Sequence, residues 1–477
     1  MSGSRGSRAI RWLWLAAAAW APLSCSFLPE REGPAEPEVP EAFSVSGGGA
    51  AAPEAWWEDF DSPELSRLVS EAFSGSFSLR QVEARLRQAR AAAGIAGSEL
   101  YPSLSAEVEG GATRARTGSS GERVTATTEQ YSAALAASYE IDLWGRVRST
   151  ARAADADVAA ASWDLDAARV SLAAALADRW LNVVELKARR TLVEEQLKSN
   201  RTYLDLLRLR QTKGLATALA VFQQEQIVAG TAALIPSLQA QLETNTHDLA
   251  VLTGRPPRSD LGLAVDSLPS LTPLPAVGLP SELLERRPDI RAALARLEAA
   301  DWEVAAARAN RLPALSLTGS AGFRSNEFDD LFSNWFAGFV AGLVAPLVDG
   351  GRRSAEAARS EAVSDERLSS YRETVLTALG EVENALARES RQDEYIRSLD
   401  RQLAAARNAF SEAMLRYRKG DIEYLDVLAS LSSVQGLERQ VLSARRDLLL
   451  YRVGLYRSLG GGWEPVPENE NGEKDEK

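Results

Sequence analysis

Two patterns of apolar residues alternate along the chain. In the first, apolar residues recur every three or four positions, as at Val375, Leu379, Val382 and Leu386, which indicates helices that pack closely against neighbouring helices. The longest stretch of this kind covers residues 146–212, about 67 residues, and predicts a helix of roughly 100 Å. A compact globule of this size cannot hold two such helices, so we predict a mainly α-helical, elongated protein.

The second pattern is an alternation of apolar with small or polar residues, which indicates strands. Leu104, Ala106 and Val108 alternate in this way, and Tyr131 and Leu135 do so again after a polar stretch. The same arrangement returns in the second half of the chain, more loosely in its last strand. We predict two pairs of strands, at residues 103–113, 129–142, 314–324 and 334–347.

These elements occur twice in the same order. The copies are related by an offset of 206 residues, which pairs Gly145 with Gly351, Gly214 with Gly420 and Gly254 with Gly460. One fixed offset over more than a hundred residues indicates an internal repeat. Each copy is predicted to hold a helix, two strands, a long helix and a shorter return helix.

The repeat and the composition of the segments around it predict the organisation of the chain. Pro, Glu and Gly dominate the segment before the first copy, and such a composition cannot bury a core. The predicted parts are a signal peptide (1–24), a lipidated Cys with a flexible linker (25–55), repeat 1 (56–262), an inter-repeat linker (263–281), repeat 2 (282–462) and a disordered acidic tail (463–477).

Four strands cannot form a closed barrel, because membrane barrels have at least eight. Open sheet edges are not viable in lipid, so strands in a membrane would have to be pooled from several chains. Three chains would supply twelve. The alternative is a soluble four-stranded sheet packed on the helices, but the export signal and the repeat favour the membrane.

The N-terminus has the pattern of an export signal. Arg5, Arg8 and Arg11 precede an apolar run at residues 12–23, which is too short to span a bilayer. The run ends next to Cys25, which is the only cysteine. We predict that Cys25 is the lipidated first residue of an outer-membrane lipoprotein; the alternative is a plain secretory signal with an incidental cysteine.

The composition excludes several classes of function. The formal net charge of −12 argues against a nucleic-acid partner, and a single His leaves no His-rich metal or acid–base cluster. The sequence also lacks a phosphate-binding glycine loop and paired zinc-ligand spacings. We therefore predict no enzyme activity, no catalytic residue, no metal and no cofactor.

The chain resembles the TolC-like outer membrane factor family, within it the lipoprotein branch typified by OprM and NodT. The resemblance covers essentially all of the chain from Cys25 to Gly462. It rests on Trp56-Trp57-Glu58-Asp59-Phe60, Tyr139-Glu140-Ile141-Asp142-Leu143-Trp144-Gly145-Arg146, Glu285-Arg286-Arg287-Pro288-Asp289-Ile290-Arg291, Pro346-Leu347-Val348-Asp349-Gly350-Gly351-Arg352 and Tyr424-Leu425-Asp426-Val427-Leu428.

This resemblance implies a trimeric duct, with a twelve-stranded β-barrel in outer-membrane lipid continuous with a twelve-helix periplasmic tunnel. It implies a homotrimer that docks on a periplasmic adaptor protein and an inner-membrane pump and expels small toxic molecules. Two alternatives stay open. One is a duct of the same fold for protein or peptide export, and the other is a soluble periplasmic coiled-coil scaffold.

The resemblance also places the periplasmic tips at the turns Lys213-Gly214 and Lys419-Gly420. A tight turn between helices needs a residue that tolerates positive φ, which gives each glycine a structural reason. With threefold symmetry, one inward Asp426 would become a ring of three carboxylates that favours cations at a constriction. Without the resemblance, Asp426 is an ordinary exposed carboxylate.

The tip departs from the family pattern in ways that reduce its acidic charge. Family members often carry acidic residues where this chain has Ala429 and Ala220, and a basic residue where it has Ser432. Four other residues of the second turn could take part in the constriction. They are Tyr417, Arg418, Asp421 and Glu423.

Overall fold

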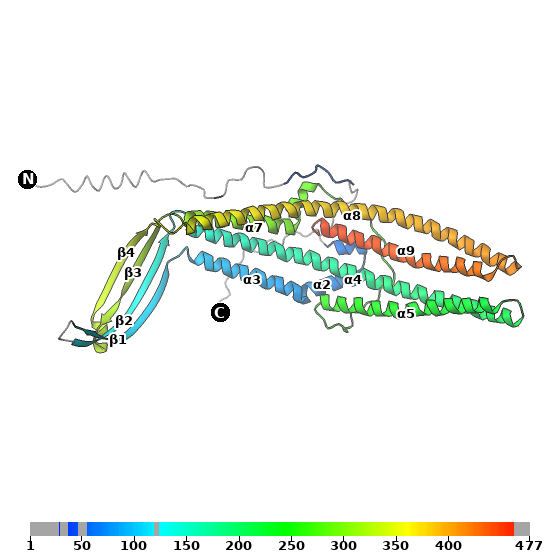
Figure 1. The fold of residues 1–477 in the computed structure, drawn as a ribbon, viewed down its shortest axis with the longest axis horizontal. Helices are drawn as coiled ribbons and strands as arrows, with labels where there is room; N and C mark the ends of the chain where they lie inside the picture. Colours follow the sequence, from blue (N-terminus) through cyan, green and yellow to red (C-terminus); the bar gives the residue numbers. More distant parts are fainter. Residues whose placement is uncertain (1–27, 29–36, 46–54, 119–123, 462–477) are drawn as a thin grey trace, which may run out of the picture. The chain divides into compact units, whose positions relative to one another are not determined.

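The computed structural model describes residues 28, 37–45, 55–118 and 124–461 (Figure 1). The predicted signal peptide, the lipidation site Cys25 and the acidic tail lie outside these residues. The chain divides into two compact units, and each unit takes segments from both repeats. Unit 1 contains the strands and the adjoining helix ends, and unit 2 contains the remaining parts of the helices.

Unit 1 is built on one antiparallel sheet in the order β1-β2-β3-β4. The strands are β1 (Ser103–Thr117), β2 (Val124–Ile141), β3 (Ala314–Ser325) and β4 (Trp335–Val344), with the short 3₁₀ helix η3 (Phe328–Ser333) between the last two. β2 from repeat 1 pairs with β3 from repeat 2, with Leu135 opposite Ala321. The outer edges of β1 and β4 have no neighbouring strand within the described chain.

The two faces of this sheet differ in polarity. Because side chains alternate along a strand, the register places Leu104, Val108 and Leu135 on one face. Ala321, Phe323, Trp335, Phe339 and Leu343 continue that face across β3 and β4. Apart from the half-buried Phe323, these apolar side chains are open to solvent in the single chain: Val108 is 85% exposed and Phe339 is 71% exposed. The opposite face of β1 carries Ser and Glu.

The long helices begin just after the strands, at a motif shared by both repeats. The Asp142 carboxylate accepts hydrogen bonds from the backbone N–H groups of Val147 and Arg148, at 3.2 and 2.9 Å. Asp349 has a similar place in the second copy, where it accepts hydrogen bonds from the backbone N–H groups of Gly351 and Arg353, at 3.1 and 3.3 Å. These carboxylates satisfy N–H groups that the first helical turn leaves unpaired, which fixes the start of each long helix.

The helices match the predicted pattern of long and return helices in both copies. Repeat 1 has α2 (Pro63–Gly75), α3 (Phe77–Ser98), α4 (Arg146–Thr212) and α5 (Ala218–Leu252); repeat 2 has α6 (Leu283–Arg286), α7 (Pro288–Ala309), α8 (Arg352–Lys419) and α9 (Tyr424–Ser458), with the 3₁₀ helices η1 (Trp56–Phe60) and η2 (Pro280–Glu282) before the first helix of each copy. The long helices have 67 and 68 residues, and the return helices have 35 each.

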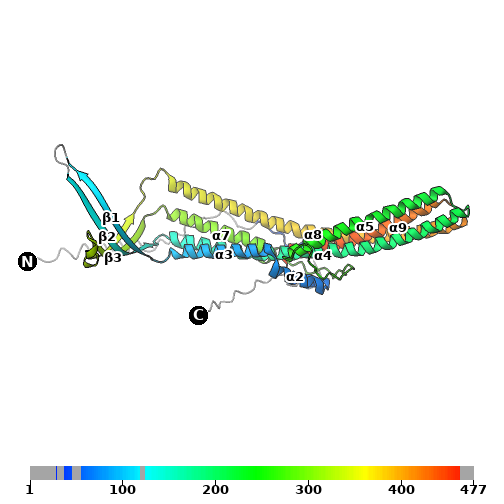
Figure 2. The ribbon, with the colours of Figure 1, turned by 90° about the horizontal axis from the view of Figure 1, so that it is seen from below.

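In unit 2 each long helix packs against its return helix. Leu186, Val193 and Leu238 form a small core between α4 and α5, and a second core joins α8 to α9. The views in Figure 1 and Figure 2 agree that α5 follows α4 and α9 follows α8 back from the turns. The largest core surrounds the fully buried Trp180, and there the ring of Trp56 stacks on Tyr456 at 5.4 Å.

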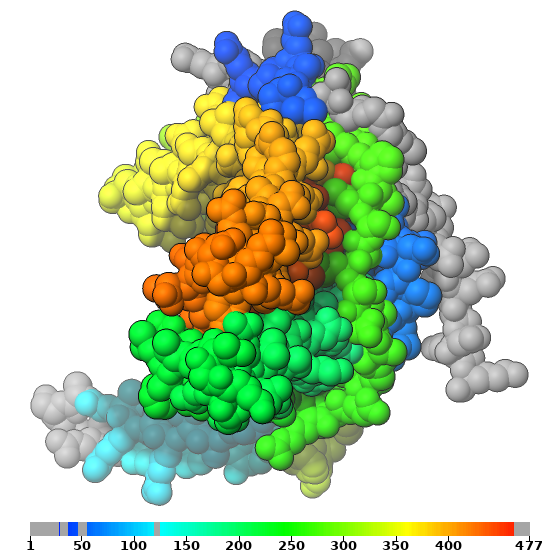
Figure 3. Space-filling view, turned by 90° about the vertical axis from the view of Figure 1, so that its right-hand side faces the viewer, coloured from blue at the N-terminus to red at the C-terminus, as the bar shows by residue number. Residues whose placement is uncertain are grey.

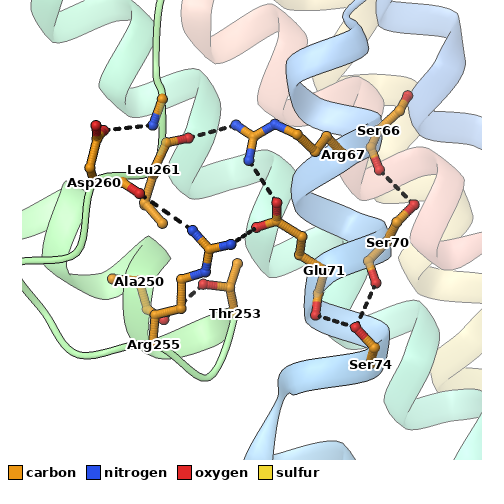
Figure 4. A network of polar contacts seen from close by, with 11 residues as sticks. Ser66, Arg67, Ser70, Glu71, Ser74, Ala250, Thr253, Arg255, Asp260 and Leu261 are labelled. Atoms are coloured by element: carbon orange, nitrogen blue, oxygen red, sulfur yellow. Dashed lines mark hydrogen bonds and ion pairs between the residues drawn. The ribbon is translucent and has the colours of Figure 1, made fainter.

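The end of α5 lies directly against the junction of α2 and α3. A Cβ at Gly254, whose φ is +78°, would lie 2.1 Å from the carbonyl oxygen of Gly75, so only glycine fits this approach. Figure 4 shows the polar contacts that hold the junction: Arg67 and Arg255 both bind Glu71, with N–O distances of 2.8 and 3.0 Å. The C-terminal end of α5 therefore meets the junction of α2 and α3, and α4 packs against both.

Candidate functional site

The candidate site is the pair of helix turns at the end of unit 2. At the first turn, the N–H of Leu215 bonds to the carbonyl of Arg210 at 2.9 Å, and Gly214 has a φ of +71°. At the second, the N–H of Asp421 bonds to the carbonyl of Arg416 at 3.0 Å, and Gly420 has a φ of +86°. Both are glycine caps in which a left-handed residue closes the last turn of a long helix.

The end of repeat 1, by which we mean the turn between α4 and α5, is apolar. Leu215 and Leu219 are both 64% exposed, and Phe222 is 65% exposed. The Thr217 hydroxyl caps α5 by accepting a hydrogen bond from the N–H of Ala220, at 3.2 Å. Of the residues predicted here, Lys213 and Gly214 are exposed. In the single chain this end is therefore a patch of leucine and phenylalanine with one cation at its edge.

The end of repeat 2, the turn between α8 and α9, is charged: three carboxylates follow the basic residues Arg416, Arg418 and Lys419. Asp421, Glu423 and Asp426 are all exposed, and none of their carboxylates has an ion-pair partner in the part of the chain that the structure describes. Glu423 occupies the position before α9, where its side chain makes no capping hydrogen bond. Arg418 and Lys419 are exposed beside them. In Figure 3 this end (orange) lies next to the end of repeat 1 (green).

Tyr417 faces the other turn instead of standing free. The guanidinium of Arg210, from repeat 1, lies over the Tyr417 ring at 4.8 Å, and the rings of Tyr417 and Tyr424 meet edge to face at 5.3 Å. The Tyr424 hydroxyl donates a 2.7 Å hydrogen bond to the side-chain oxygen of Gln224. Burial raises the pKa of the Tyr424 phenol, so this hydroxyl remains a donor at physiological pH. The two turns are thereby joined within one chain.

The contact between Tyr424 and Gln224 begins a line of buried polar side chains, which we call the polar seam. Gln224 donates to the backbone carbonyl of Asn200 at 2.8 Å. Asn200 and Gln435 exchange two side-chain hydrogen bonds, of 3.2 and 2.9 Å, and Asn200 also donates to Thr231. Asn200 and Gln224 are fully buried, so each amide depends on these partners.

The polar seam continues along α4 and α9, away from the turns. Five contacts define this part: Gln196 with Gln435 and with Glu438, Arg439 with Gln196, Ser443 with Glu185, and Arg446 with Asn182. The return helix of repeat 2 is therefore bound by polar contacts to the long helix of repeat 1. This junction joins the two copies of the repeat.

Sequence reasoning did not identify Tyr424, Gln224 or the polar seam. Asn200 and Gln196 interrupt an apolar stripe of α4 at positions that face a neighbouring helix, and this interruption was the available signal. The sequence does not show which helix supplies the partners. No group of three or more His, Cys, Asp or Glu side chains among the described residues is placed to hold a metal ion.

Residues 68–255 and 279–461 match the family model for the outer membrane efflux protein. The chain is 36% identical over 417 residues to the pyoverdine export outer membrane protein OpmQ of Pseudomonas aeruginosa, covering 86% of the chain and 87% of the relative. It is 33% identical to the outer membrane protein OprJ of the same species, covering 92% and 94%.

Solved structures show the same fold. The outer-membrane channel OprN superposes with a TM-score of 0.85 and 31% identity, covering 92% of this chain and 100% of the other. The open state of the MtrE outer membrane channel of Neisseria gonorrhoeae gives a TM-score of 0.79 at 30% identity, covering 92% and 98%. The fold class predicted from the sequence is confirmed by these matches.

Proposed function

The chain belongs to the outer membrane efflux protein family, and we propose that three copies of it form a passive duct for small toxic molecules. The predicted resemblance is confirmed by this membership, and so is the role as outer-membrane channel component of an efflux system. Its relatives are channel proteins. Conduction through a duct needs no catalytic group, so we propose that the chain is not an enzyme.

The two-faced sheet with open edges carries this proposal. The apolar face of β1 to β4 is exposed in the single chain, as at Val108 and Phe339. β1 and β4 each have one edge with no partner in the described chain. Unpaired N–H and C=O groups are not tolerated in lipid, so the edges have to pair with other copies. Three copies give twelve strands, with the apolar face toward lipid and the polar face toward the lumen.

A second observation supports assembly by the same number of copies. α5 and α9 are equivalent helices. One stripe of α9, which includes Gln435, Arg439 and Arg446, binds the long helix α4 of the other repeat. The corresponding stripe of α5 is uncharged and exposed: it comprises Leu219, Phe222, Gln226, Ala229, Ala233, Ser237 and Ala240. We infer that this stripe packs on α8 of the next copy and thereby repeats the α4–α9 junction between chains, which closes a ring of helices.

This inference also accounts for the hydropathy of α5. Within the described residues, α5 is the one helix with the length and apolar composition to cross a membrane, and only 22% of its most apolar window is buried in the single chain. Its sequence contains Pro236, and Gln224 and Thr231 take part in the polar seam. A helix that bonds to α4 in this way is suited to packing between helices, so we assign its apolar surface to the neighbouring copy.

We propose that the carboxylates at the end of repeat 2 lie at the narrowest point of the duct. Asp426 is exposed and free of ion-pair partners in the described chain, and threefold symmetry would make it a ring of three carboxylates. Such a ring favours cations over anions. Asp421 and Glu423 would add to it, whereas Tyr417 is held by Arg210 and Tyr424. The end of repeat 1 would contribute apolar surface between the acidic turns.

We propose that the chain lies in the outer membrane with a lipid on Cys25 and its helices in the periplasm, where an adaptor protein and an inner-membrane pump dock. Mass spectrometry of the mature N-terminus tests the lipid: we expect a di- or triacylated Cys25, and an unmodified chain that starts elsewhere would contradict it. Because the barrel itself inserts, we expect Cys25→Ala to lower efficiency more than it abolishes transport.

The relatives favour small molecules as the transported class. Their names specify pyoverdine, toluene, antibiotics and cations, which differ in charge and size. We infer that the duct is permissive and that selection occurs at the pump. A duct for peptide export would keep the same fold, and a strain that lacks this protein distinguishes the two. Accumulation of small molecules inside that strain supports efflux, and retention of a normally exported protein supports peptide export.

Cross-linking of the purified protein in detergent tests the assembly. We expect a trimer with the full strand content and no stable folded monomer. Conductance of the trimer in a planar bilayer then tests the duct. A well-behaved monomer with all four strands intact would contradict the proposal, and a protein released from membranes by carbonate washing would instead support the periplasmic scaffold.

A further inference from the structure

The upper part of β1 carries two arginines on the face that is apolar lower down. Alternation places Arg114 and Arg116 on the same face as Leu104 and Val108, and the register sets them opposite Thr127 and Thr125 of β2. Both arginines are exposed. They lie next to the β1–β2 turn, at the end of the sheet farthest from the helices. In the barrel described above, this is the extracellular end of the outer surface.

The apolar part of the face has the length of a membrane span. On β2 it runs from Ile141 to Tyr131, about 11 residues, which is within the 9–11 that a tilted strand needs. Its upper limit is marked by aromatic rings: Tyr131 contacts Phe328 of η3 at 5.5 Å, and Phe323 contacts Phe332 at 5.4 Å. Rings of this kind sit at the boundary between lipid tails and headgroups.

The arginines lie just beyond that boundary. Tyr131 pairs with Gly110 of β1, so Arg114 follows the aromatic level by four residues, which is roughly 13 Å along the strand and about 10 Å in height for a tilt near 40°. A guanidinium on its flexible stem reaches back over several ångströms. Arg114 therefore falls at the level of the lipid headgroups, and Arg116, two residues further along the strand, lies about 5 Å higher.

The two guanidiniums are available to a ligand. Neither Arg114 nor Arg116 has an ion-pair or hydrogen-bond partner within residues 28, 37–45, 55–118 and 124–461. One carboxylate shares their face, that of Glu129, and it accepts a 3.1 Å hydrogen bond from the Tyr131 hydroxyl. Among the described residues of β1 and β2, two positive charges thus share this face with one negative charge; the exposed carboxylates of Asp329 and Asp330 follow Phe328 in η3, at the aromatic level below the arginines.

We propose that Arg114 and Arg116 bind phosphate groups of the lipid that forms the outer leaflet. This inference rests on the proposed function, because it requires the apolar face to lie in a membrane. Arginine suits the task, since its planar fork donates paired hydrogen bonds to phosphate oxygens and keeps its charge at every physiological pH. Three copies would place three such pairs around the barrel and hold it at a fixed height in the leaflet.

The experiment compares three forms of the full-length trimer. One is wild type. The second, Arg114→Thr with Arg116→Ala, removes both guanidiniums. The third exchanges neighbours, with Thr113→Arg, Arg114→Thr, Ala115→Arg and Arg116→Ala, so that net charge and composition are unchanged but both guanidiniums move to the lumen face. The exchanged form separates binding by face from attraction by charge alone.

Each form is placed in vesicles of phosphatidylcholine alone, of phosphatidylcholine with bisphosphorylated lipid A, or of phosphatidylcholine with lipid A stripped of phosphate. The measurements are the lipid A retained per trimer and its dissociation constant. We expect wild type to bind phosphorylated lipid A and both variants to bind about tenfold more weakly or worse, since one charge-assisted hydrogen bond contributes on the order of tenfold. Stripped lipid A should bind all three forms equally weakly.

Three outcomes would overturn the inference. One is equal retention by wild type and the double variant. Another is full binding by the exchanged form, which would show attraction by charge alone. The third is that inorganic phosphate, added in detergent without lipid, binds wild type as tightly as phosphorylated lipid A does. That result would indicate a site for free anions. If a variant does not assemble, Arg114→Thr and Arg116→Ala are tested singly. Failure of wild type itself to insert as a trimer would contradict the proposed function instead.

Discussion

The return helices α5 and α9 are equivalent by the repeat and equal in length, but their surfaces differ. Gln435, Arg439 and Arg446 of α9 are bonded to α4 within the chain. The positions 206 residues earlier on α5 are Ala229, Ala233 and Ala240, and all three are exposed. In repeat 2 this stripe makes polar contacts within the chain, and in repeat 1 the same positions are exposed alanines.

The long helices show the matching difference. Asn200 of α4, which bonds Gln435, corresponds to Ala406 of α8. A buried amide without a partner is strongly unfavourable, and the partner is certain only when both residues are on the same chain. Small apolar residues tolerate a partner that arrives later, from another copy. The α4–α9 junction, which forms when the single chain folds, is therefore polar. The α5–α8 junction, which we infer forms when copies assemble, is apolar.

The comparison breaks most severely if α5 receives a charge. Ala233→Arg places a long cation on the exposed stripe, where the neighbouring copy has to approach closely, so we expect loss of the trimer. The matched control is Gln239→Arg, which is also exposed but lies about 120° away around the helix. Chemical cross-linking and native mass spectrometry measure the outcome. Normal trimer yield from Ala233→Arg would show that the stripe is not an interface.

The buried amide pair gives the next largest effect. Asn200→Ala leaves Gln435 without its partner, and we expect a loss of about 1–3 kcal/mol in the free energy of unfolding of the helical part. Asn200→Ala with Gln435→Ala removes both amides, as at the Ala406 and Ala229 positions, and should lose less than the sum of the single changes. Denaturant unfolding followed by circular dichroism measures the cycle. Strict additivity would contradict the coupling.

The long helices, the strands and the repeat could be predicted from the sequence alone. The helices and strands follow from the local spacing of apolar residues, and the repeat follows from its constant offset. Not every strand end could be predicted in this way. β1 continues past the predicted Thr113 to Thr117, since Arg114 and Arg116 keep the alternation after the apolar residues stop. The last strand ends at Val344, earlier than predicted, because Pro346 lacks the N–H that a ladder needs.

The tip shows a different limit of the sequence. Exposure of Asp421, Glu423 and Asp426 follows from their charge, but the position of Tyr417 does not follow from its own segment. Tyr417 is held by Arg210, which is far away in the sequence and brought close by the junction of the two repeats. A partner of this kind is fixed by tertiary packing, so neither periodicity nor the offset of the repeat reveals it.

Asp178 offers a pH-dependent test of how the copies differ. Burial raises the pKa of its carboxyl to about 6, and nearby Arg457 and Arg179 only partly oppose this. The corresponding residue of repeat 2 is Asn384. Because the folded pKa lies above the unfolded value, the folded state binds a proton that the unfolded state releases, so the charged form lowers stability above about pH 6.

Asp178→Asn should therefore raise the thermal midpoint of the trimer at pH 7.5, by a few degrees at most. The gain should shrink as the pH falls through 6, where the folded carboxyl takes up its proton, and should vanish only below the ordinary value of 3.8, where the carboxyl is protonated in both states. Thermal melts of both forms across this range measure the difference. Glu243→Gln, on an exposed carboxylate of α5, serves as the control and should show no comparable trend. A gain that is constant with pH would contradict the assignment to Asp178.

The smallest expected effect concerns the two turns. Asp426→Asn removes one carboxylate per chain from the end of repeat 2, and we expect the cation-to-anion permeability ratio to fall by about two- to threefold in low salt. Leu215→Asp is its complement, because Leu215 is the exposed counterpart of Asp421, and it should raise the ratio by making the first turn resemble the second. Reversal potentials of trimers in planar bilayers measure both, and trimer yield is the control for each. If Asp426→Asn leaves the ratio unchanged while Leu215→Asp raises it, the lumen at this level is lined by repeat 1, and Asp426 lies on the outer surface. If neither changes it, the narrowest point lies away from both turns.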